Sequence, residues 1–254
     1  MGVHRKISEI QKEYRELTEK DYETFIHTYQ EDERAAVRKM AEAVVRKRQA
    51  LIAEQKRMFE MFAYERKYQE YQYICGIDEV GRGPLAGPVV AGAVILPKDC
   101  SLLYLNDSKQ LSEKRREELY DQIMAEAVAV GIGYASPERI DEINILNADY
   151  EAMREAISKL PVKPDLLLND AVTIPEVEIR QVPIIKGDTL SASIAAASIV
   201  AKVTRDRLMV QYDAVMPEYK FASNKGYGSK EHIEAIKAFG PSVIHRRSFI
   251  KNFI

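Results

Sequence analysis

The chain changes character near residue 70, and this change limits its possible folds more than any other feature. Residues 1–70 hold no proline and one glycine, Gly2, and are crowded with Glu, Lys, Arg, Ala and Tyr. Proline and glycine interrupt helices, so a stretch without them favours long ones. Beyond residue 70, short apolar runs alternate with helical patterns, which is typical of an α/β domain on a mixed sheet. The sequence therefore predicts a helical N-terminal extension, residues 1–70, followed by an α/β domain, residues 71–254.

Apolar residues in the extension recur at steps of three and four, as on one face of a helix. A first helix is indicated by Ile7, Ile10, Tyr14 and Leu17. A second, longer one is indicated by Val37, Ala41, Val44, Leu51, Met58 and Phe62, with the basic run 46–48 on its polar side. Two interpretations stay open: a solvated helical pair that packs on the main domain, or an arm that brings basic side chains to a substrate.

The α/β domain shows five candidate strands and four candidate helices. The strands are expected at 74–77, 89–96, 131–134, 166–168 and 178–185, and the helices at 111–130, 138–160, 189–216 and 229–239. The second strand is rich in β-branched residues, as strands buried on both faces are. Small residues crowd the first half of 189–216 and would let that helix lie close against the sheet.

Charge and cysteine content exclude several classes of protein. The 254 residues carry 37 basic and 39 acidic side chains, a net charge of -2, so any basic surface for nucleic acid must be local. Two cysteines, Cys75 and Cys100, are too few for a disulfide framework and lack the partners of a zinc site. We see no signal peptide and no apolar stretch long enough for a bilayer, and expect a cytoplasmic protein.

Four acidic residues stand at or just after strand ends. Asp78 and Glu79 end the first strand, Asp170 ends the fourth, and Asp188 precedes the long helix. Ligands of open α/β sheets bind at the carboxyl ends of strands, and adjacent carboxylates near a core are costly without a cation. Each acid also has an ordinary alternative: a solvated loop for the pair, a turn for Asp170 and an N-cap for Asp188.

The segment after the paired acids, residues 81–88, is rich in glycine and proline. A Gly-x-Gly after a strand is also found in dinucleotide-binding folds. Here Pro84 and Pro88 interrupt the segment, and a strand follows where a phosphate-binding helix should begin. A plain hairpin explains the glycines but leaves Arg82, between Gly81 and Gly83, without a reason.

Five sequence blocks together resemble the ribonuclease HII family, in the order that family has them. They span most of residues 73–250. The blocks are Cys75 to Val94 with its Asp78-Glu79-Val80-Gly81-Arg82-Gly83 centre, Asn106-Asp107-Ser108-Lys109, Lys186-Gly187-Asp188 with the helix Ser193 to Lys202, Lys225-Gly226-Tyr227-Gly228, and His245-Arg246-Arg247-Ser248-Phe249. The sister ribonuclease HIII family carries Gly-Lys-Gly in place of Gly-Arg-Gly, so Arg82 favours HII.

The resemblance implies a ribonuclease H-like fold and assigns roles to particular residues. It implies that Asp78, Glu79, Asp170 and Asp188 are the metal-binding, catalytic carboxylates. It also implies that Gly81, Arg82 and Gly83 sense the ribose 2′-hydroxyl, with Tyr227 stacking on the sugar beside the cut. The block around Asp170 departs from the family's usual Val-Asp-Gly, since it reads Leu168-Asn169-Asp170-Ala171.

Elementary chemistry supports the same interpretation. Hydrolysis of a phosphodiester is assisted by two hard cations, and four carboxylates suit two Mg²⁺ or Mn²⁺ ions per active site. The expected partners are RNA–DNA hybrids and RNA–DNA junction duplexes, bound by a monomer. The candidate phosphate contacts are Lys109, Lys202, Lys225, Arg246 and Arg247. The histidines His232 and His245 are expected to face solvent.

Two rival functions share some of these features. A DNA-cutting enzyme of the integrase or resolvase kind would use similar acids without sensing the 2′-hydroxyl. A non-catalytic nucleic-acid-binding module would have no use for four acids beside phosphate.

Overall fold

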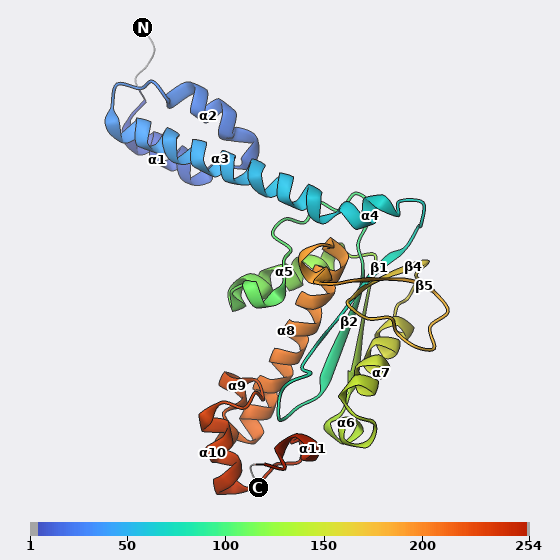
Figure 1. Cartoon of the computed structure of the whole chain (residues 1–254). Coiled ribbons are helices and arrows are strands. Elements are labelled where there is room, and N and C mark those ends of the chain that lie inside the picture. Colours follow the sequence, from blue (N-terminus) through green and yellow to red (C-terminus); the bar gives the residue numbers. More distant parts are fainter. Residues whose placement is uncertain (1–4, 253–254) are drawn as a thin grey trace. The chain divides into compact units, whose positions relative to one another are not determined.

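The computed structural model describes residues 5–252 and divides into two compact units, residues 1–59 and 60–254 (Figure 1). The first unit is helical. It contains α1 (Ile7–Glu16), a 3₁₀ turn η1 (Glu19–Asp21), α2 (Tyr22–Tyr29) and the greater part of α3 (Ala35–Met61). The helices predicted from both apolar patterns are confirmed, and α2 between them was not predicted.

The first unit has a small core of its own. Its buried residues come from all three helices: Ile10, Phe25, Tyr29, Val37, Ala41 and Val44. Phe25 and Tyr29 lie one turn apart on α2, with ring centroids 4.7 Å apart. This short helix therefore closes the core that the two predicted helices leave open.

The second unit is built on a five-stranded mixed sheet in the order β3-β2-β1-β4-β5. The strands are β1 (Ile74–Val80), β2 (Val89–Ile95), β3 (Ala129–Ala135), β4 (Leu166–Asp170) and β5 (Arg180–Ile184). The first three pair antiparallel, whereas β1–β4 and β4–β5 pair parallel. All five predicted strands are confirmed, with shifts of a few residues at their ends.

Eight helices accompany the sheet in the described part of this unit. They are α4 (Ala63–Lys67), α5 (Glu113–Glu126), α6 (Pro137–Ile143), α7 (Ile145–Ser158), α8 (Ala192–Val215), α9 (Phe221–Asn224), α10 (Lys230–Phe239) and α11 (Arg247–Ile250). Short 3₁₀ turns η2 (Ser108–Gln110), η3 (Gly187–Thr189) and η4 (Pro217–Tyr219) precede α5, α8 and α9. None of the described helices is long and apolar enough to cross a membrane.

Three sequence expectations for helices need correction. The predicted helix 138–160 is broken at Asn144, whose φ of 70° is left-handed and whose side chain caps α7. The predicted helix 111–130 ends at Glu126, because β3 already begins at Ala129. The N-cap of α8 is Ser191 and not Asp188, which lies in η3. Asp188 is therefore free of the capping role that was its ordinary alternative.

Glycine lets α8 lie directly on the sheet. A Cβ on Gly76 of β1 would come within 2.0 Å of the Ser193 carbonyl carbon, and one on Gly92 of β2 within 2.5 Å of the Ala197 carbonyl oxygen. The small residues of α8 and these glycines thus allow backbone-to-backbone packing. The close approach expected from the small residues of 189–216 is confirmed.

The two faces of the sheet carry different helices, α8 on one and α7 on the other (Figure 1). Gly76 faces α8, so Asp78, two residues on, points to the same face. Leu168 packs with Ile194 of α8, so Asp170 also points there. Ile77 packs with α7 residues, which puts Glu79 on the opposite face. Because side chains alternate along a strand, the adjacent acids Asp78 and Glu79 lie on opposite faces of the sheet.

Candidate active site

Asp170 ends β4, and Asp78 lies beside it near the end of the neighbouring parallel strand β1, which continues to Val80. Ile77 is paired with Asn169 across β1 and β4, so the two acids come next in register and point to the same face. Asp78 is 5% exposed. The structure thus brings together two acids that are 92 residues apart in the sequence, including the one whose local sequence departs from the family.

Asp188 joins this pair through the turn before α8. The Gly187 N–H donates to Asp170 Oδ1 at 2.7 Å, which ties the turn to the end of β4. Lys186 enters the turn with a left-handed φ of 58°. The carboxyl edge of β1 and β4 therefore carries three of the predicted acids, and Glu79 adjoins them from the other face.

The carboxylates destabilise one another's charged forms. Burial raises the pKa of Asp78 well above its ordinary value, and the charges of Glu79 and Asp170 raise it further. Burial also raises the pKa of Glu79, although Arg82 opposes this. The pKa of Asp188 is raised by burial and by Asp107 and Asp170. Such a cluster has an electrostatic need for a nearby cation.

The donor set fits hard divalent cations. It offers carboxylate oxygens, the ligands that Mg²⁺ and Mn²⁺ prefer, and its repulsion would be relieved by positive charge. Among residues 5–252, no three His, Cys, Asp or Glu side chains already close around one point. The acids are gathered without forming a finished coordination shell.

A fully buried arginine holds the Gly81–Gly83 loop. The Arg246 guanidinium donates to the carbonyl oxygens of Gly81 (2.6 Å), Arg82 (2.9 Å) and Gly87 (2.8 and 3.0 Å). Burial lowers the pKa of Arg246 to about 9, with the charge of Arg205 adding to the effect. Arg246 was predicted to contact phosphate; the structure instead buries it at 0% exposure and directs its N–H groups to the loop.

A second buried arginine joins this loop to the one that carries Tyr227. Arg205 donates to the carbonyls of Pro88 and Ala86 on one loop and of Lys225 on the other. The Leu85 N–H also donates to the Gly226 carbonyl at 2.8 Å. The Tyr227 ring lies beside Gly83, since a Cβ there would stand 3.9 Å from Tyr227 Cε1. The predicted sensing residues are therefore neighbours in one hydrogen-bonded unit.

Arg82 lies between two acids. Its side chain pairs with Asp149 Oδ2 at 2.8 Å and with Glu79 Oε1 at 3.7 Å. Burial raises the pKa of Asp149 to about 7, and the nearby Glu79 carboxylate adds to this. Asp149 was not predicted from the sequence. The available signal was an acidic residue on the buried, otherwise apolar face of α7, next to Ala152.

Two buried histidines are linked by hydrogen bonds to the loop that carries Tyr227. The Tyr227 carbonyl can only accept, so His232 Nδ1 carries a proton and donates to it at 2.8 Å. His232 Nε2 then accepts from His245 Nε2 at 2.9 Å, and His245 Nδ1 accepts from the Ser242 N–H. Both rings are neutral in this chain, and both are buried. The expectation that they face solvent is wrong.

The remaining predicted phosphate contacts differ in availability. Lys109 is exposed and close to Asp78, Asp188 and Tyr227; burial opposes its charge, but acids led by Asp107 raise its pKa. Arg247 is exposed. Lys202 is paired with Asp206 at 2.7 Å, and Lys225 donates to the Ala222 carbonyl.

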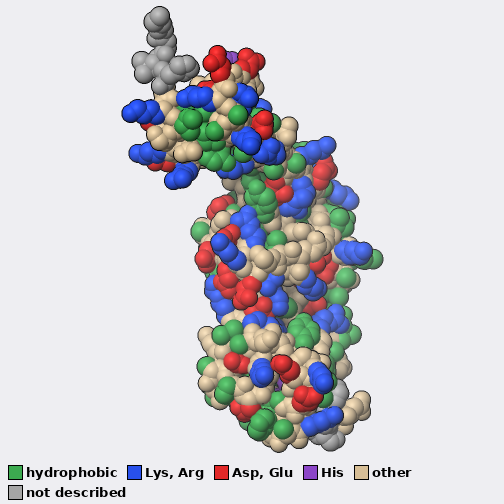
Figure 2. All heavy atoms as spheres, turned by 90° about the vertical axis from the view of Figure 1, so that its left-hand side faces the viewer, with side chains coloured by type: hydrophobic (Ala, Val, Ile, Leu, Met, Phe, Trp, Pro, Cys, Tyr) green, Lys and Arg blue, Asp and Glu red, His purple; other side chains and the backbone are tan. Residues whose placement is uncertain are grey.

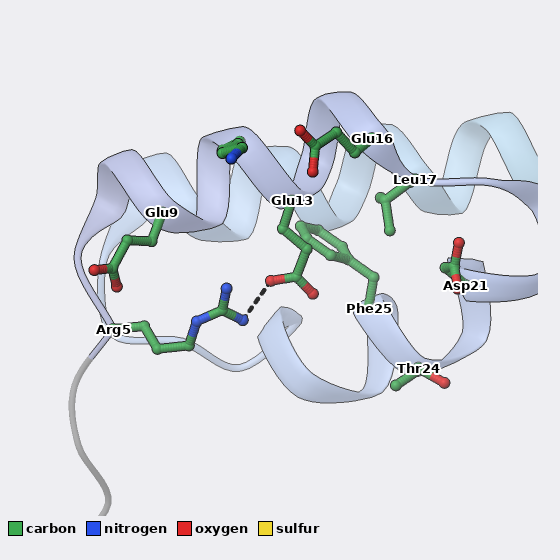
Figure 3. Close-up of a pocket in the computed structure, with 9 residues that line it drawn as sticks. Arg5, Glu9, Glu13, Glu16, Leu17, Asp21, Thr24 and Phe25 are labelled. Carbon is green, nitrogen blue, oxygen red and sulfur yellow. Dashed lines mark hydrogen bonds and ion pairs between the residues drawn. The ribbon is translucent and has the colours of Figure 1, made fainter.

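Neither the surface view nor the pocket of the first unit offers a competing site. Figure 2 shows acidic and basic side chains interspersed over the drawn face of the second unit, without a broad basic surface. Figure 3 shows a hollow between α1 and α2, where Arg5 and Glu13 pair beside Phe25. Arg5 neutralises Glu13, and Phe25 belongs to the core of the unit, so we interpret the hollow as a surface feature of the helical unit.

Comparison with known proteins identifies the class and then the family. The structure of ribonuclease H2 from Pyrococcus horikoshii matches with a TM-score of 0.56 and 28% identity, covering 69% of this chain and 93% of that one. Bst-RNase HIII in complex with Mn²⁺ shares the fold, with a TM-score of 0.54 and 18% identity over 70% of this chain and 67% of that one. The mixed sheet and its flanking helices thus have the fold of a type 2 ribonuclease H.

The sequence comparisons are closer. The family model for ribonuclease HII matches residues 75–252, and the model for the ribonuclease HII N-terminal domain matches residues 6–69. A ribonuclease HII from Lachnoclostridium phytofermentans is 65% identical over 97% of both chains. The chain belongs to the ribonuclease HII family and is an endoribonuclease, as the five sequence blocks predicted.

Proposed function

We propose that this protein cleaves the RNA strand of RNA–DNA hybrids and incises duplex DNA on the 5′ side of a single ribonucleotide. Asp78, Glu79, Asp170 and Asp188 would hold two Mg²⁺ or Mn²⁺ ions. The observation that carries the proposal is the gathering of these mutually repelling carboxylates beside the Gly81–Gly83 loop. A binding module without catalysis has no reason to maintain such a cluster next to a phosphate backbone.

The reaction is a hydrolysis that leaves a 3′-hydroxyl and a 5′-phosphate. A water oxygen bonds to phosphorus, the bond from phosphorus to the 3′ oxygen breaks, and that oxygen takes up a proton. Bound cations supply activation of the water and neutralise charge on the entering and leaving oxygens. The chain's own acids fix where this happens, because their positions are set by β1, β4 and the turn before α8.

Selection of RNA would rest on the two joined loops. Gly83 has no side chain and is exposed, so backbone groups at this point are open to a ribose 2′-hydroxyl. Tyr227, 43% exposed beside it, offers an aromatic face for stacking. Arg82 belongs to this loop, and its side chain pairs with Asp149 and with Glu79, one of the proposed metal ligands.

Lys109 and Arg247 are the favoured phosphate contacts. Both are exposed, and Lys109 lies within the electrostatic reach of Asp78 and Asp188. A lysine there would bind the phosphate next to the cut and offset the acids' repulsion of the nucleic acid. We also propose that the protein works as a cytoplasmic monomer in the removal of ribonucleotides from DNA, since one chain supplies every proposed site residue and both cysteines are free thiols.

A cleavage assay on three end-labelled duplexes tests the proposal: a DNA duplex with one embedded ribonucleotide, a continuous RNA–DNA hybrid, and plain DNA. With Mg²⁺ or Mn²⁺ we expect incision 5′ of the lone ribonucleotide, cutting of the hybrid, and intact DNA. Cleavage of plain DNA would favour the integrase-like rival. No cleavage and no metal binding would favour the non-catalytic module.

A further inference from the structure

The short helix α4 contacts the first turn of α8, from a part of the chain that our sequence analysis assigned to the extension. α4 belongs to the second unit by its contacts, yet the N-terminal-domain family model covers it. Glu65 Oε1 accepts hydrogen bonds from Ser191 Oγ at 2.6 Å and from the Ser193 N–H at 2.9 Å. These contacts link residues 126 and 128 positions apart.

The contact completes the N-terminus of α8. The first N–H groups of a helix have no partner within it. Ser191 Oγ accepts from the Ile194 N–H, and Glu65 takes the Ser193 N–H. Ser191 and Ser193 are 0% and 1% exposed, so water cannot easily replace the carboxylate. A negative charge at this end also suits the helix dipole.

The turn before α8 carries one proposed metal ligand, Asp188, and contacts another, Asp170. The Ser191 N–H donates to the Gly187 carbonyl at 2.8 Å, and the Gly187 N–H donates to Asp170 Oδ1 at 2.7 Å. Asp188 lies inside this chain of hydrogen bonds. A restraint on Ser191 is therefore a restraint on the segment that presents Asp188 and touches Asp170.

Packing fixes α4 itself. Tyr64 and Tyr68 pack on a buried cluster that includes Leu168 of β4 and Ile194 of α8. Arg180 of β5 donates to the Tyr71 hydroxyl at 2.6 Å and lies over the Tyr68 ring. The carboxylate of Glu65 is thus carried by an anchored helix, as a positioning group requires.

We propose that Glu65 is a positioning residue for the active site: by holding Ser191 and Ser193 it fixes the turn that presents Asp188 and contacts Asp170. The inference rests on the proposed function of those acids. It gives the segment before β1 a role in activity itself, separate from any role of the first unit in binding the substrate.

The test uses the full chain with Glu65→Ala, Glu65→Gln and the control Glu60→Ala, an exposed acid at the end of α3. Partners of metal ligands are worth roughly 10–100-fold in activity or metal affinity. We expect Glu65→Ala to lower kcat by about this factor and to raise the Mn²⁺ concentration for half-maximal rate, with KM for hybrid unchanged. Glu65→Gln should recover most of the rate, because its amide oxygen still accepts from Ser193.

Assays run well below each variant's Tm separate positioning from unfolding. Faster amide exchange at Ser193 in Glu65→Ala, with Glu60→Ala unchanged, would support the proposal. An unchanged kcat and Mn²⁺ dependence in Glu65→Ala would overturn it, and so would a loss that Glu65→Gln fails to recover. An unmodified protein that cuts no RNA would instead refute the proposed function, while amide exchange would still test the contact.

Discussion

Two neighbouring regions differ in what their charged groups contact: the carboxylate cluster of Asp78, Glu79, Asp170 and Asp188, and the two loops that Arg205 joins, residues 81–88 and 225–227. In the cluster, buried acids raise one another's pKa values and form no finished coordination shell among the described residues. In the loops, Arg205 and Arg246 are each fully buried and each donate to three carbonyl groups. Like charges therefore repel one another in the first region, whereas hydrogen bonds to buried arginines hold the second region together.

The difference indicates which part of the site is prepared in advance. A saturated buried network is rigid, because any displacement leaves polar groups unpaired. The surface that we propose to recognise RNA is therefore preorganised by contacts within the protein. The acids are positioned by their backbones, and bound cations would relieve their mutual repulsion. Substitutions of the acids should therefore lower cleavage, whereas substitutions of the buried arginines should lower the stability of the fold.

The largest effect is expected for the acids. Asp78→Asn or Asp170→Asn should reduce cleavage by at least about 1,000-fold, beyond the loss on removing one oxyanion-hole donor, because the amide keeps the shape but not the attraction for cations. Binding of hybrid should persist, and a gel-shift assay beside the cleavage assay checks this. Near-normal turnover by Asp170→Asn would mean that another acid takes its place.

Removal of Arg246 should cost stability. Arg246→Met leaves the carbonyls of Gly81, Arg82 and Gly87 without donors, at about 1–3 kcal/mol for each unsatisfied group, so a total of roughly 3 kcal/mol or more is expected in urea unfolding. The matched control is Arg247→Met, an exposed neighbour expected to lie within about 0.5 kcal/mol of the unmodified protein. Equal stability of both variants would show that the network is not saturated as described.

Acid should weaken the Tyr227 support through the histidine pair. Burial lowers the pKa of His245 to about 4, and the nearby His232 and the charge of Arg247 add to the effect. The unfolded chain binds protons near pH 6.5, whereas the folded protein resists them, so stability falls as pH drops from about 6.5 toward 4. By pH 5 this amounts to at most about 2 kcal/mol. Unfolding of His245→Gln across that range should show a shallower decline; an identical decline would exclude the pair as its source.

The smallest effect is a change in substrate preference. Tyr227→Ala should lose more rate on a duplex with one ribonucleotide than on a continuous hybrid, by about tenfold, since stacking is worth roughly 1–3 kcal/mol per base. Tyr227→Phe keeps the ring and should retain the preference. Equal losses on both substrates by Tyr227→Ala would make the residue part of the scaffold only.

The sequence predicted the parts of the site that lie on short, contiguous motifs. Asp78, Glu79, Asp188, the Gly81–Gly83 loop and Tyr227 stand in blocks that resemble the family, whereas Asp170 stands outside those blocks and was predicted from its place at a strand end. All five strands were predicted from the sequence, the second of them from a run of β-branched residues, and the close packing of α8 was predicted from its small residues. The helix break at Asn144 was missed because a left-handed residue interrupts an otherwise continuous apolar pattern.

The supporting residues could not be predicted in the same way. Arg246 beside the exposed Arg247 looks like a solvated basic run, and only the tertiary fold turns one of the two inward. His232 and His245 are 13 residues apart in the sequence, and this spacing does not predict the hydrogen bond between them. Glu65 meets Ser191 from a segment that reads as part of the extension.

Thermal unfolding in chelator and in Mn²⁺ tests most directly whether the four acids bind divalent cations. A ligand at 100 times its Kd stabilises the folded state by about 2.7 kcal/mol, so the Tm of the unmodified protein should rise with Mn²⁺. In chelator, Asp78→Asn should melt above the unmodified protein because repulsion is relieved, and it should lose most of the Mn²⁺ response, whereas Asp149→Asn keeps it. An unmodified protein indifferent to Mn²⁺, or an Asp78→Asn variant with the full response, would contradict the account.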